Sequence, residues 1–260
     1  MTAAARRLWQ HYGFALAYLG LFLAAELTYV LLDPAAQARV IAWASTDLAN
    51  LEHEPAAPLL LSALVTPGYF AAWPVLFGLA VFGANRALGN AVTALVCLAG
   101  HVIGTLVSEG VVAYRIDGGQ LPAADRYLTD VGPSYVVVTA AVIALACGGW
   151  LARALAAVAL AVLVFPGHIF GGLSRLDLAA VGHLTAMLTA AAAAAIILAF
   201  RRRGQRPGLD QRPGRGQRPG RGQWPGRGQR PGAGSAGHVA EGGADQVGDP
   251  GGAGAQDQLA

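Results

Sequence analysis

The stretch GPSYVVVTAAVIALACGGW, residues 132–150, decides how the chain folds. It carries no charge and is close to the length of about 20 helical residues that crosses a hydrocarbon layer of about 30 Å. Gly132-Pro133 indicates where the helix begins, because proline at the first helical position has a preset φ and lacks an N–H that would be unpaired there. We therefore predict a membrane-spanning helix with Ser134 in its first turn.

Five further apolar runs have a similar length. The six predicted crossings cover residues 14–31, 68–84, 91–108, 132–150, 154–172 and 178–200. The chain is 55% hydrophobic and 13% charged, whereas charged residues make up about a quarter of a soluble domain. These features predict an all-α, polytopic membrane protein with six transmembrane helices. A small transporter is the alternative architecture, although the inverted repeat of many transporters is not evident.

The distribution of arginines predicts the orientation in the membrane. Short segments on the side of the N-terminus hold seven Arg and no acids, whereas the opposite segments hold four Arg and nine acids. Cytoplasmic loops are enriched in basic residues, so both termini are expected in the cytoplasm. Arg6 and Arg7 resemble the start of a signal peptide, but the apolar run behind them is longer than the usual 7–15 or so residues, so the helix is retained. All eighteen basic residues are Arg, a bias typical of a high-GC bacterial genome, which favours the plasma membrane of a bacterium.

The chain divides into three parts. Residues 1–12 form a cytoplasmic N-terminus, residues 13–200 the membrane domain, and residues 201–260 a tail that repeats hexapeptides such as QRPGRG. The tail has almost no apolar side chains and is expected to be disordered. Its ten Arg at 201–232 lie next to the last helix, where anionic lipid headgroups attract each Arg with about 1 kcal/mol. A solvated repeat extension is the alternative, and nucleic-acid binding is not expected.

The first outer loop contains a short apolar segment, residues 55–65. It is too short to cross the bilayer, and Pro67-Gly68 separates it from the next crossing. Such a segment is typical of a re-entrant or interfacial element.

Polar groups within predicted crossings are costly and are therefore candidates for function. They are Glu26, His101, Ser108, Ser134, His168 and His183. Ser134 and His183 lie four and six residues past the acids Asp130 and Asp177 that begin their helices, which places both about 5–10 Å below the outer surface. We expect the Ser134 hydroxyl within hydrogen-bond reach of His183, or a modest side-chain rotation from it, and His101 deeper in the bundle.

Such a pair can perform nucleophilic chemistry. The N–H groups of Ser134 and Tyr135 have no intrahelical partners, and the positive end of the helix dipole favours an oxyanion beside them. A serine at this place needs a base, which His183 can supply. The alternatives are structural: a serine bonds its own i−4 carbonyl, a histidine such as His101 joins two helices, and Glu26 snorkels outward or pairs with a polar neighbour. No metal-binding, phosphate-binding or dinucleotide-binding motif is present, so neither a metal nor a cofactor is expected.

Several motifs in this order resemble the rhomboid intramembrane serine proteases, over about residues 13–200. They are LEHEPAAPLLLSALVTPGYF (51–70), NRALG (85–89), GPS (132–134) and Gly182-His183; GHVIGTLVSEG (100–110) with DVGPSY (130–135) is closer to the rhomboid-like membrane proteins of actinobacteria. The resemblance implies a rhomboid-like bundle in which Ser134 is the nucleophile and His183 its base, without an acid. Tyr135, Tyr69 and His101 are then the oxyanion or supporting residues.

Two departures from the family pattern bear on whether the protein is catalytic. Tyr135 replaces the second glycine of GxSG, and the HxxxN pair of the second helix is missing, with Tyr69 in the nearest run. Losing an oxyanion donor costs about 10²–10³ in turnover. The protein is then either an intramembrane protease that cleaves a client helix near the outer face, or a non-catalytic protein that binds transmembrane clients or acts as a scaffold.

Overall fold

The computed structural model describes residues 2–68 and 71–204, and within these ranges the chain forms helices and turns but no strand. Six main helices correspond to the six predicted crossings: α1 (Ala3–Val30), α5 (Ala72–Leu88), α6 (Asn90–Asp117), α7 (Ser134–Cys147), α8 (Trp150–Val164) and α9 (Leu178–Gly204). The shorter elements are α2 (Pro34–Ala44), α3 (Leu48–His53), α4 (Ala56–Leu61), η1 (Ser62–Leu64), η2 (Ala123–Tyr127) and η3 (Leu173–Arg175). The all-α prediction is confirmed.

The six helices are of two kinds. Within the described residues α1, α6 and α9 are long and apolar enough to cross a membrane, whereas α5, α7 and α8 are shorter apolar helices. The 14 residues of α7 span about 21 Å, because Pro133 limits the helix at its start and Gly148 ends it.

All six helices differ from the predicted bounds at one end or both. The largest differences are that α1 begins at Ala3 and not at residue 14, and that α6 continues to Asp117, past the predicted end at 108. Local chemistry explains two of the smaller differences. Helix α5 runs later than the predicted 68–84 and ends at Gly89, whose φ of 78° suits glycine. Helix α8 begins at Trp150 and ends before Pro166, because proline has no N–H to continue the helical hydrogen bonds. Helix α9 continues to Gly204, past the predicted boundary at 201. The predicted disorder of the tail from residue 205 onward lies outside the described residues.

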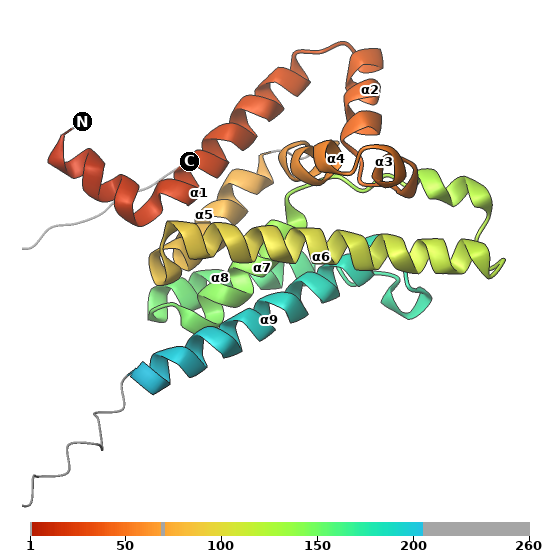
Figure 1. The fold of residues 1–260 in the computed structure, drawn as a ribbon. Helices are drawn as coiled ribbons and strands as arrows, with labels where there is room; N and C mark the ends of the chain where they lie inside the picture. The colour runs from red at the N-terminus through yellow and green to blue at the C-terminus, as the bar shows by residue number, and fades with distance from the viewer. Residues whose placement is uncertain (1, 69–70, 205–260) are drawn as a thin grey trace, which may run out of the picture. The chain divides into compact units, whose positions relative to one another are not determined.

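Helix α7 occupies the centre of the bundle. It packs against α5, α6, α8 and α9 (Figure 1), and nearly every residue from Tyr135 to Ala144 is buried. The peripheral α8 buries only Ala156, Ala159 and Leu163. Helix α7 is therefore more completely enclosed by other helices than α8 is.

Residues 59–66, here termed the re-entrant segment, include the end of α4 and all of η1 and reach into the bundle. The Tyr18 hydroxyl of α1 donates to the Ala63 carbonyl oxygen at 2.9 Å. The Thr66 N–H donates to the carboxylate of Glu26, so Glu26 pairs with a polar neighbour, one of its two predicted alternatives. His101 Nε2 lies 3.0 Å from the Leu59 carbonyl oxygen. His101 is eleven residues from the start of α6, or about 16 Å along its axis, so the segment reaches deep into the bundle, as expected for a re-entrant element.

Candidate functional site

The turn before α7 exposes several unpaired backbone groups. The sequence predicts Pro133 at the first helical position. In the structure Pro133 is the N-cap residue, and α7 begins one residue later, at Ser134. The first helical bond runs from the Val137 N–H to the Pro133 carbonyl oxygen at 2.9 Å. The N–H groups of Ser134 and Tyr135 therefore have no partner within the helix, as predicted. The Gly132 N–H donates to the Ser62 carbonyl oxygen at 2.6 Å, which ties this turn to the re-entrant segment.

His183 on α9 is buried, with 5% of its surface exposed. Its Nδ1 lies 3.1 Å from the Ile169 carbonyl oxygen. Because a carbonyl only accepts hydrogen bonds, Nδ1 carries the proton and Nε2 keeps its lone pair. Among the described residues Nε2 has no hydrogen-bond partner. This is the tautomer that a general base requires.

Tyr135 fills the space beside this imidazole. Only 2% of Tyr135 is exposed, and its ring meets the His183 ring edge to face, with centroids 5.0 Å apart. The ring centroid of His101 is 6.0 Å from that of Tyr135. A Cβ atom on Gly182 would lie 2.1 Å from the Tyr135 hydroxyl oxygen, so the glycine provides room for the ring.

The structure thus brings α7 and α9 together, but it places Tyr135 against the imidazole. Ser134 is half-buried as the first residue of α7. Within the part of the chain that the structure describes, no hydrogen bond joins its hydroxyl to His183. The proximity of the Ser134 hydroxyl and the His183 imidazole stays a prediction.

Asp130 links the outer loops to this site and was not among the predicted site residues. Its carboxylate accepts from the Tyr135 hydroxyl at 3.2 Å and from Thr46 Oγ1 at 3.3 Å. The Thr46 N–H also donates to the Asp130 carbonyl oxygen, and Ser45 Oγ accepts from the Asp130 N–H. Burial disfavours the charged carboxylate and raises the pKa of Asp130 to about 6. The sequence offered one signal, an acid two residues before the Gly132-Pro133 helix start.

A seam of buried polar side chains continues from this site between α6, α7 and α9. Atoms within the described residues that are buried and have no partner include His101 Nδ1, Thr105 Oγ1, Glu109 Oε1, Thr139 Oγ1 and His183 Nε2. Residues 101, 105 and 109 are four apart and so share one face of α6. That spacing was the available signal for Thr105 and Glu109, which sequence reasoning missed.

Three predicted candidates remain: Tyr69, His168 and Ser108. Tyr69 falls outside the described residues. His168 is exposed in the turn after α8, with a φ of 48°, and Ser108 Oγ donates to the Thr105 carbonyl oxygen of its own helix. In residues 2–68 and 71–204 no group of three or more His, Cys, Asp or Glu side chains converges as a metal site.

Comparison with known proteins supplies the class. The rhomboid-like protein family matches residues 13–203, most of the chain. The chain therefore belongs to the rhomboid-like protein family, and with its apolar helices it is a multi-pass membrane protein. No curated protein and no solved structure matches it.

Proposed function

We propose that this protein is a non-catalytic member of its family that binds transmembrane segments of other membrane proteins. The observation that carries the proposal is the buried ring of Tyr135 against His183. A tetrahedral intermediate on Ser134 needs room for its oxyanion beside the first N–H groups of α7. The ring fills space next to those groups, and its hydroxyl is already bonded to Asp130.

The side of the bundle formed by α5 and α8 supports client binding. A hollow of about 360 Å³ lies between these helices, and Gly78 and Gly149 in its lining leave open space where a Cβ atom would stand. Small residues let the backbone of another helix approach closely. Leu151 beside them is more than half exposed, so a client helix has both a close approach and apolar contacts there.

A serine-directed fluorophosphonate probe on the purified protein tests the absence of catalysis. The wild type is expected to remain unlabelled, while Tyr135→Gly, which restores the family's GxSG, gains labelling that Ser134→Ala in the same background removes. Wild-type labelling that Ser134→Ala abolishes would overturn the proposal.

Photo-crosslinking from position 151 in native membranes, compared with position 196 on the lipid-facing side of α9, tests client binding. Equal adduct yields at both positions would count against client binding.

One observation favours the second candidate, an intramembrane serine protease with Ser134 as nucleophile and His183 as base. His183 Nε2 has a free lone pair and sits on a helix packed against α7. Wild-type cleavage of a transmembrane reporter, abolished by Ser134→Ala and by His183→Ala, is the expected result for this candidate.

We further propose that the protein lies in a bacterial plasma membrane with both termini in the cytoplasm, as the arginine distribution favours. A cysteine introduced at Gln120, in the loop after α6, should react with an impermeant reagent from outside intact cells. Reaction only after permeabilisation of the cells would show that the protein has the opposite orientation. The domains are proposed as residues 1–12, 13–200 and 201–260.

The Arg-rich tail is proposed to bind anionic lipid headgroups. Vesicles with phosphatidylglycerol should bind a peptide of residues 205–232 and release it as salt rises, whereas vesicles of phosphatidylcholine should not bind it. Equal binding to both vesicles would leave the tail as a solvated extension.

A further inference from the structure

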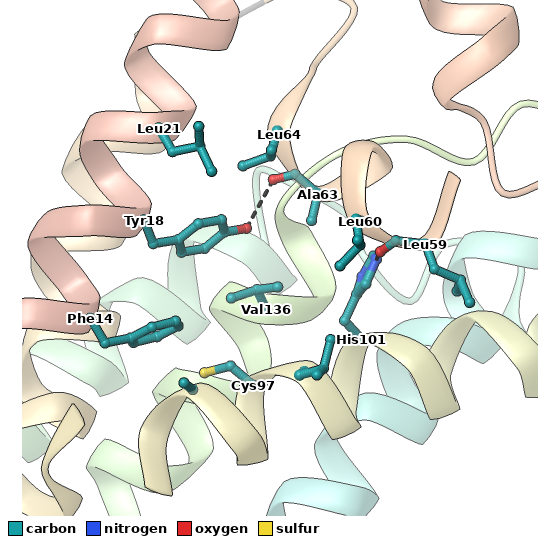
Figure 2. Close-up of a pocket in the computed structure, with 12 residues that line it drawn as sticks. Phe14, Tyr18, Leu21, Leu59, Leu60, Ala63, Leu64, Cys97, His101 and Val136 are labelled. Carbon is teal, nitrogen blue, oxygen red and sulfur yellow. Dashed lines mark hydrogen bonds between the residues drawn. The ribbon is translucent and has the colours of Figure 1, made fainter. Parts of the chain in front are cut away.

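An apolar cavity lies on the side of α6 that faces α1, and His101 stands between it and the ring of Tyr135. Its volume is about 330 Å³, within the range of about 300–1,000 Å³ typical of sites for small molecules. Figure 2 shows its walls: Tyr18 from α1, Ala63 from the re-entrant segment, and Cys97 and His101 from α6. Val136 of α7 closes the inner end.

The cavity lies about halfway along the membrane-spanning helices. Tyr18 and His101 are near the midpoints of α1 and α6, each 28 residues long. Both are at least about 16 Å from either end of their helix at 1.5 Å per residue. A ligand headgroup at the membrane surface cannot reach this depth, whereas lipid tails fill it.

The mouth of the cavity is lined by side chains that face outward from the bundle. Leu21 is 55% exposed, Leu60 62% and Leu98 46%. In a membrane-spanning protein these surfaces meet hydrocarbon, so the cavity opens to the lipid.

The polar groups in the wall are directed to protein partners. The Tyr18 hydroxyl donates to the Ala63 carbonyl oxygen (Figure 2), and His101 Nε2 donates to the Leu59 carbonyl oxygen. His101 Nδ1 is the exception, since it is buried and has no partner among the described residues. The other lining side chains are apolar, so an occupant gains from contact with apolar walls and loses free energy for most polar groups that it brings in.

We propose that this cavity is a binding site for the terminal part of one acyl chain of a bilayer phospholipid. The bound acyl chain contacts the residues of the re-entrant segment that line the cavity. That segment holds the turn before α7 through the bond from the Gly132 N–H to the Ser62 carbonyl oxygen. Occupancy of the cavity therefore stabilises the position of the turn that carries Ser134, whether or not this serine is reactive.

Photolabelling tests the site directly. The full-length protein is placed in nanodiscs containing a trace of phospholipid with a diazirine near the end of one acyl chain. Label is expected on Cys97 and Val136, which line the cavity but are almost completely buried. Label confined to outward-facing residues such as Leu95 would overturn the proposal.

A pair of variants on one helix provides the control. Ala94 lines the cavity and Leu95 next to it does not. Ala94→Trp should lower the label on Val136 by about tenfold, the change given by about 1.4 kcal/mol of binding free energy, while Leu95→Trp should leave it unchanged. Leu98→Trp is a second plug should Ala94→Trp fail to fold, as judged by helicity and gel filtration.

Two outcomes contradict the acyl chain as occupant. One is equal labelling of Val136 in the plugged and control variants, which shows that the label reaches it by another path. The other is a covalent link from a photo-reactive residue at position 98 to a second copy of the chain or to another protein, formed in place of a lipid adduct, which shows that a helix covers the mouth.

Discussion

The two sides of α6 differ in how closely they pack. Toward α7 and α9 the helix presents glycines: a Cβ atom on Gly100 would lie 2.1 Å from Thr139 Oγ1, and one on Gly104 would lie 3.0 Å from the Gly182 carbonyl oxygen. Toward α1 it presents Cys97 and Leu98 and leaves a cavity. Lipid tails are as apolar as these side chains, so helix contacts in a membrane depend on close packing and hydrogen bonds. The glycine side of α6 therefore holds the bundle together, whereas the α1 side leaves room for the proposed acyl chain.

The largest effect is expected for Gly100→Ala. The new methyl group overlaps Thr139, which is fully buried and has little room to move, so the free energy of unfolding should fall by about 1–3 kcal/mol. Thermal unfolding in detergent measures it. Gly110→Ala on the same helix meets open space and should lose nothing. Thr139→Ala should recover part of the loss in the Gly100→Ala background, and two independent losses would contradict the proposed contact.

Tyr135→Phe tests the hydrogen bond that fixes the ring. The substitution keeps the edge-to-face contact with His183 and removes the bond to Asp130, which should lower the free energy of unfolding by about 1 kcal/mol. Tyr127→Phe, at an exposed position, is the matched control. A Tyr135→Phe protein as stable as the wild type would show that packing alone holds the ring.

The pH dependence of stability should report on Asp130. Because burial raises its pKa from 3.8 to about 6, the folded state binds this proton more tightly than the unfolded chain does. Its contribution is therefore fully present below about pH 4, falls as pH rises through 6, and is constant above that. Asp130→Asn should flatten this part of the curve, measured as unfolding midpoints between pH 4 and 7, while Asp125→Asn at a half-buried position of η2 should not. An identical slope in both variants would assign the pH dependence to other groups.

The smallest effect is expected on the opposite side of α6. Ala94→Leu adds three methylene-sized groups beside the cavity and should change stability by only about 0.5 kcal/mol, in the favourable direction. A loss as large as that of Gly100→Ala would mean that the two sides of α6 are equally tightly packed.

Local signals in the sequence were sufficient for part of the site. The Gly132-Pro133 signal located the start of α7 within one residue, and the polar groups Ser134, His101 and His183 were named from their cost in a membrane. Asp130 was missed because its role depends on Thr46 and Ser45, which are more than 80 residues away in the chain. Thr105 and Thr139 were missed because threonine is uncharged, so a threonine within an apolar run does not stand out as a costly group in a membrane.

The all-α class, the six apolar helices and their order can be predicted from the sequence, because hydrophobic length and helix-start chemistry are properties of short segments. Tertiary structure alone decided that Tyr135 lies against His183 and that the α1 side of α6 encloses a cavity. The physical reason is rotation: neighbouring residues of a helix differ by about 100° in direction, so which of Ser134 and Tyr135 faces α9 depends on how the helices pack. Glycines at 100, 104 and 182 set that packing by allowing backbones to approach, an effect that only the contacts across helices reveal.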